Sequence, residues 1–151
     1  MRRWLSATVG AVVLVLALSG CVGSARTTAS YEGKALRSAQ DGLSVLQTAL
    51  LSVQTSLSGR MMQDYLETVL SESEDAFSSI HATFDSIQPP NTDTSDQLRD
   101  SLDNLLAAGA DGMAQLRVLA RRQDTSALAA EARKLVATTE GLDKFVKDHG
   151  G

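Results

Sequence analysis

Residues 36–57 read LRSAQDGLSVLQTALLSVQTSL, a segment in which apolar side chains recur alternately three and four positions apart. The recurring positions are Leu36, Ala39, Leu43, Leu46, Leu50, Val53 and Leu57. This spacing places the apolar side chains in a row on one face of an α-helix, where they are expected to be buried. We call such a row a seam. Because Gly59 favours a helix end, we predict a first helix over residues 31–58. The alternative is one longer helix that continues through Gly59 with a kink.

The same spacing resumes after Gly59. The second seam consists of Met62, Leu66, Val69, Ser73, Ala76 and Ile80, with Phe77, Phe84 and Ile87 alongside. Proline excludes the helical conformation from the residue before it, so Pro89-Pro90 ends this helix. We therefore predict a second helix over residues 60–87.

Two further helices follow the prolines. Thr94 with Gln97 resembles a capping box and predicts a third helix over residues 94–122. Asp124 is the expected cap of a fourth helix over residues 125–148. The third seam consists of Leu98, Leu102, Leu105, Gly109, Gly112, Leu116 and Leu119, and the fourth of Leu128, Ala132, Leu135, Thr139, Leu142 and Val146.

Four helices with short connections favour an all-α, antiparallel up-down-up-down four-helix bundle over residues 31–149. No alternating strand pattern competes with this interpretation. The average spacing of 3.5 residues predicts left-handed packing of the coiled-coil type.

The N-terminus has the organisation of an export signal. Two arginines precede an uncharged run from Leu5 to Leu18. Its 14 residues are fewer than the about 20 that a membrane-spanning helix needs. Small residues at 19 and 20 complete the pattern of a cleavable signal.

Leu18-Ser19-Gly20-Cys21 is similar to the lipobox of bacterial lipoproteins. The resemblance covers residues 1–21 and implies cleavage between Gly20 and Cys21, which removes residues 1–20. It also implies diacylglycerol on the Cys21 sulfur and often an acyl chain, such as palmitate, on the new amino group. The alternatives are an ordinary secretory signal with an incidental cysteine, or an uncleaved anchor.

Cleavage would leave 131 residues, with 12 of the 14 basic side chains, all 18 acidic ones and a net charge of −6. This charge argues against nucleic acid and against adsorption to anionic lipid. The lipid on Cys21 is thus the expected contact with the cell membrane, and residues 21–30 the flexible tether. With no other cysteine, the exported chain is expected to form no disulfide.

The sequence carries no enzyme signature, and we expect a protein without catalytic residues, cofactor or metal. His81 and Asp85 stand one helical turn apart and could share a proton or a weak metal contact. An exposed pair beside the seam is the simpler interpretation.

Small or hydroxyl-bearing residues align in the predicted bundle. Folding about the three turns brings Gly109 level with Ser73 and Thr139, and Gly112 extends this layer. Two glycines inside a helix cost about 1 kcal/mol each relative to alanine. The layer predicts either a small ligand cavity with orienting hydroxyls or close helix packing.

The same antiparallel folding is expected to gather basic residues at one end of the bundle. Arg60, Arg117, Arg121 and Arg122 are expected at the end away from the membrane. They either complement helix dipoles or dock an acidic protein or a polyanionic envelope polymer.

The sequence therefore predicts an exported, lipid-anchored helical module of the cell envelope with a binding or structural role. The alternative is a bundle that senses or carries a ligand in the layer of Ser73, Gly109 and Thr139. The oligomeric state stays open.

Overall fold

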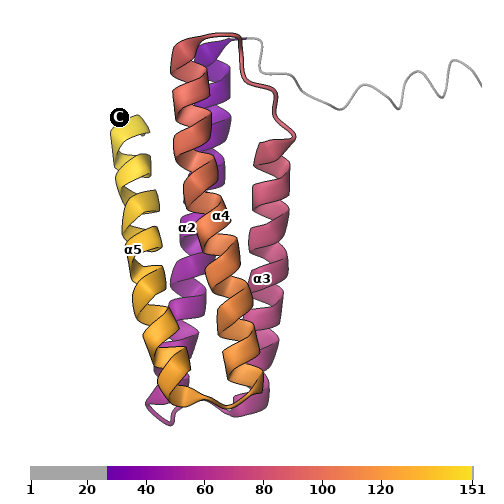
Figure 1. The fold of residues 1–151 in the computed structure, drawn as a ribbon, viewed down its shortest axis with the longest axis vertical. Helices are drawn as coiled ribbons and strands as arrows, with labels where there is room; N and C mark the ends of the chain where they lie inside the picture. The colour runs from indigo at the N-terminus through magenta and orange to yellow at the C-terminus, as the bar shows by residue number, and fades with distance from the viewer. Residues whose placement is uncertain (1–26, 151) are drawn as a thin grey trace, which may run out of the picture.

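The computed structural model describes residues 27–150. They form α2 (Thr28–Leu57), α3 (Gln63–Asp85), α4 (Asp93–Arg121) and α5 (Thr125–His149), which run antiparallel along one axis, in turn down, up, down and up in the view of Figure 1. The predicted all-α four-helix bundle is confirmed. Gly20, Cys21 and the rest of the signal and lipobox lie outside the described residues. No helix in the described part is long and apolar enough to cross a membrane.

The bundle has two distinct ends (Figure 1). The proximal end holds the start of α2 and the connection from α3 to α4, and the distal end holds the α2–α3 and α4–α5 turns. We use these two names below. The predicted separation of the first two helices at Gly59 is confirmed. Gly59 has a positive φ of 71°, a conformation that glycine adopts without the steric cost of a side chain.

Two boundaries differ from the sequence prediction. α2 begins at Thr28, inside the predicted tether, because the Thr27 side chain accepts a hydrogen bond from the Ser30 amide. The predicted capping box of Thr94 and Gln97 is wrong. Thr92 is the cap of α4, and its hydroxyl accepts a hydrogen bond from the Ser95 amide. The predicted Asp124 cap is confirmed, since its carboxylate accepts from the Ala127 amide at 2.9 Å.

The bundle has two diagonal helix pairs, and one of them, α2 and α4, is in direct contact. We call this contact the α2–α4 diagonal. α2 and α4 contact each other and both remaining helices, whereas the described parts of α3 and α5 do not meet. Small residues make the α2–α4 approach possible: a side-chain carbon added at Gly42 of α2 would lie 3.3 Å from Leu106 of α4. Close helix contact of this kind requires the small residues that α2 carries.

With this diagonal contact, the buried residues of α2 and α3 differ in part from the predicted seams. In α2 the centre of the core includes Ala35, Gly42 and Ala49, while the predicted Leu57 is exposed. In α3 the centre runs through Leu66, Leu70, Ser73, Phe77 and Phe84, and Met62 and Ala76 are exposed. The predicted seams of α4 and α5 hold better, because Leu98, Leu102, Leu116, Leu128, Leu135 and Leu142 are all buried.

Candidate functional site

The predicted small-residue layer is filled by an aromatic ring at Gly109. A side-chain carbon at Gly109 would lie 2.8 Å from Cε1 of Phe77 and closer still to Cζ. The same ring lies 3.3 Å from the corresponding position at Gly42. Phe77 thus packs between the α2 and α4 backbones. Of the two alternatives for this layer, a ligand cavity or close helix packing, the contacts at Gly109 are those of close packing.

The other residues of this layer are also used for packing or local bonds. A side-chain carbon at Gly112 would lie 2.5 Å from Cδ1 of Leu135 on α5. The Thr139 hydroxyl donates to the Leu135 carbonyl at 3.0 Å, one turn back in its own helix. Ser73 is buried and lines a shallow groove with Ser44, Val45 and Thr48, away from Thr139. The structure does not bring these residues to one site.

Three of the four predicted arginines lie at the distal end. Arg121 is in the last turn of α4, Arg122 is its C-cap, and both are exposed without an ion pair among the described residues. Arg60, in the α2–α3 turn, donates from Nε to the Ser58 hydroxyl at 3.0 Å. Asp64 and Asp124 share this end, but Asp124 caps α5. The three arginines outnumber these two carboxylates and leave a weakly basic surface.

Arg117 does not belong to that surface. Its guanidinium forms a two-point ion pair with Glu74 of α3, with Nη2 3.3 Å from Oε1. The hydrogen bond to Glu74, followed by the charge of that carboxylate, raises the pKa of Arg117. Arg117 connects two helices instead of facing a partner.

An apolar groove runs from the distal end between α2 and α5. Its volume is about 400 Å³, and it is lined by Leu50, Val53, Gln54, Leu57, Ala129, Ala132, Arg133 and Val136. Leu57 and Val136 are each 42% exposed. Sequence reasoning missed this groove, because Leu57 was placed in the buried seam and Val136 in none.

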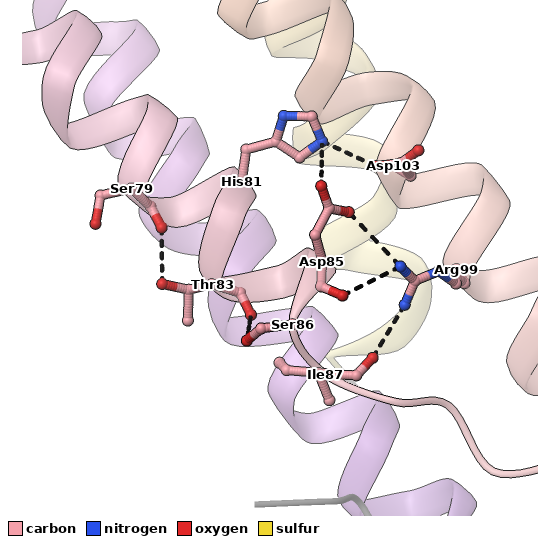
Figure 2. A network of polar contacts seen from close by, with 8 residues as sticks. All are labelled: Ser79, His81, Thr83, Asp85, Ser86, Ile87, Arg99 and Asp103. Atoms are coloured by element: carbon pink, nitrogen blue, oxygen red, sulfur yellow. Dashed lines mark hydrogen bonds and ion pairs between the residues drawn. The ribbon is translucent and has the colours of Figure 1, made fainter. Parts of the chain in front are cut away.

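A polar cluster lies nearer the proximal end, between α3 and α4 (Figure 2). Nε2 of His81 is 2.8 Å from Oδ1 of Asp103 and 3.6 Å from Oδ2 of Asp85. The predicted pair of His81 and Asp85 therefore exists, and Asp103 of α4 joins it. One ligand atom from each residue lies within 4.8 Å of the other two. Their side chains are between 20% and 48% exposed.

Arg99 of α4 fixes one side of this cluster (Figure 2). Its guanidinium donates to the Ile87 carbonyl at 3.0 Å and to the Asp85 carbonyl at 3.3 Å, where α3 ends. It also lies 3.7 Å from Oδ1 of Asp85. A cation here complements the negative end of the α3 dipole.

The cluster favours the ionised form of Asp103. The hydrogen bond to His81 lowers the pKa of Asp103 most, and Asp85 and the charges of His81 and Arg99 also lower it. Burial acts in the opposite direction. Sequence reasoning found His81 and Asp85 from their spacing but missed Asp103 and Arg99, because their positions depend on the register between α3 and α4.

The described residues thus form two candidate sites: the apolar and basic distal end, and the His81–Asp85–Asp103 cluster. Comparison with known protein families finds no match, and comparisons with curated proteins and with solved structures find no significant match either.

Proposed function

We propose that this chain is an exported, lipid-anchored, non-catalytic module that binds an acidic protein of the cell envelope through its distal end. The lipobox supports the anchor at Cys21. Helix α2 begins at Thr28, and seven residues of chain span at most about 25 Å. A lipid on Cys21 would therefore keep the proximal end near the membrane and leave the distal end accessible.

The observation that carries the binding role is the distribution of exposed apolar side chains. The large ones that are exposed among residues 27–150 are Leu51, Leu57, Met62, Tyr65 and Val136. All of them lie in the distal half of the bundle. Two of them, Leu57 and Val136, meet in the α2–α5 groove. Exposed apolar residues gathered in one place are typical of an interaction surface, whereas isolated ones are common anywhere.

The charges beside this surface favour a particular kind of partner. Arg121 and Arg122 are exposed at the distal end, and Arg133 lines the α2–α5 groove. An amphipathic acidic protein segment could bury apolar side chains in the groove and pair its carboxylates with these arginines. A polyanionic polymer would use the arginines alone, so the groove favours the protein.

The anchor is tested by Cys21→Ser. We expect the wild-type chain to fractionate with membranes and to incorporate a fatty-acid label, and the variant to lose both properties. An uncleaved N-terminus that keeps the variant in the membrane would contradict lipid anchoring.

The binding surface is tested in cells by photo-crosslinking from position 136 in the groove, with position 79 on the outer face of α3 as the control. We expect a crosslinked protein from position 136 that is lost in R121E/R122E and in L57S. Adducts of equal yield from both positions, or adducts that neither variant weakens, would exclude this surface. Loss of the adduct in R121E/R122E alone would show that the partner binds through the arginines without the groove.

A further inference from the structure

We propose that His81, Asp85 and Asp103 bind one Zn²⁺ ion across the interface of α3 and α4. The three side chains come from two helices and converge on one point at the bundle surface (Figure 2). This site is independent of the distal surface, because it lies toward the opposite end of the bundle.

The distances between the ligand atoms suit the ion. Zinc bonds to imidazole nitrogen and carboxylate oxygen measure about 2.0–2.2 Å, so two ligands of a tetrahedral site are about 3.3–3.6 Å apart. His81 Nε2 lies 2.8 Å from the Asp103 oxygen and 3.6 Å from the Asp85 oxygen. The Asp85 distance fits this range, and the Asp103 distance is shorter than it. Small rotations of exposed side chains would bring both oxygens into place.

The donor atoms suit zinc better than the harder divalent cations. Imidazole nitrogen is a preferred ligand of zinc, whereas Mg²⁺ and Ca²⁺ take oxygen ligands. Three protein ligands would leave a fourth position for water. The partial exposure of His81, at 20%, gives solvent and ion a path to this position.

The surroundings also support a cation. Two carboxylates approach the same nitrogen, and bringing like charges together is unfavourable unless positive charge compensates them. Arg99 lies on one side of Asp85, 3.7 Å from Oδ1, while Oδ2 faces His81. Arg99 therefore orients Asp85 as outer residues orient ligands in metal sites. Binding of Zn²⁺ would replace the hydrogen-bonding proton between His81 Nε2 and Asp103 Oδ1 with the divalent ion.

The site is tested by calorimetric titration of ZnCl2 into the full-length, chelator-treated protein in detergent. We expect saturable binding of one ion per chain. H81Q and D103N should each weaken this binding at least about tenfold. The matched controls are H149Q, which changes the other described histidine, and D100N, which changes an exposed aspartate one turn before Asp103. Both controls should bind as the wild type does.

The result is read together with helix content from circular dichroism. If H81Q loses its helical signal, zinc binding by D85N and D103N tests the site instead. Both variants replace one carboxylate without a change in size. The proposal is overturned if the wild type shows no saturable zinc binding, or if folded H81Q and D103N retain it. It is also overturned if H149Q weakens binding equally. In those cases the cluster is a hydrogen-bonded link between α3 and α4.

Discussion

At Gly109 and Gly33 the same substitution should have opposite effects. Alanine at Gly109 would place a side-chain carbon inside the Phe77 ring contact, whereas nothing lies within 4 Å of that position at Gly33. Crowding a packed core costs about 1–3 kcal/mol, and alanine favours a helix by up to about 1 kcal/mol over glycine. We expect G109A to lower the free energy of unfolding and G33A to raise it.

Urea unfolding followed by circular dichroism measures both changes. The G109A loss should shrink when Phe77 is also replaced by leucine, because the smaller side chain leaves room for the new carbon. A G109A protein as stable as G33A would contradict the packing of Phe77 described above.

The hydroxyl of Tyr31 is expected to lower the stability of the fold. This hydroxyl is buried and has no hydrogen-bond partner among the described residues. Removing a buried polar group that lacks a partner is favourable, so we expect Y31F to raise the free energy of unfolding by about 1 kcal/mol. Denaturant unfolding at pH 7 tests this, and a less stable Y31F would indicate an ordered water on the hydroxyl.

The same residue should make the protein sensitive to alkali. Burial raises the pKa of Tyr31 above its ordinary value of 10.0, against the opposing effect of Arg99. Above pH 10.0 the Tyr31 hydroxyl ionises in the unfolded chain while it stays neutral in the folded chain. The stabilising effect of the neutral side chain is therefore complete below pH 10.0. It is lost as the pH rises toward the folded-state pKa. The stability gap between Y31F and the wild type should therefore widen at higher pH.

At the scale of elements, the start of α4 offers a direct test of which threonine is the cap. Thr92 accepts the Ser95 amide, and loss of such a cap costs about 1 kcal/mol. Thr94 lies exposed within the first turn, where replacements change stability by less than about 0.5 kcal/mol. We expect T92A to lower the melting temperature measurably and T94A to leave it nearly unchanged. The reverse order would restore Thr94 as the cap.

The elements were largely predictable, because periodic apolar residues and Pro89-Pro90 act locally. The buried residues of α2 were less predictable than the helix positions. The central ones are Ala35, Gly42 and Ala49, and residues this small give little apolar signal in a sequence. They are buried because another helix approaches there, which depends on tertiary packing. The larger Leu36, Leu43 and Leu50 beside them are only partly buried, whereas Leu46 and Val53 of the predicted seam are buried.

At the scale of the whole molecule, register limited what the sequence could predict. The up-down-up-down order followed from short connections, and it placed Arg60, Arg121 and Arg122 at one end correctly. The sequence did not predict which side chain fills the space at Gly109: Phe77, one turn after Ser73, contacts it. The identity of that side chain decides between a cavity and a filled core. The contact of Asp103 with His81 likewise depends on how α3 and α4 pack against each other.

The short α2–α4 diagonal has a mechanical consequence. Because α2 touches all three other helices and begins at Thr28, a pull on the N-terminal chain enters a helix that has neighbours on three sides. When a partner holds the distal end, such a load runs along the helix axis and shears α2 against all three neighbours at once. A load on α5, which contacts two helices, would act on two interfaces. We therefore expect the bundle to resist tension applied through α2 better than tension applied through α5.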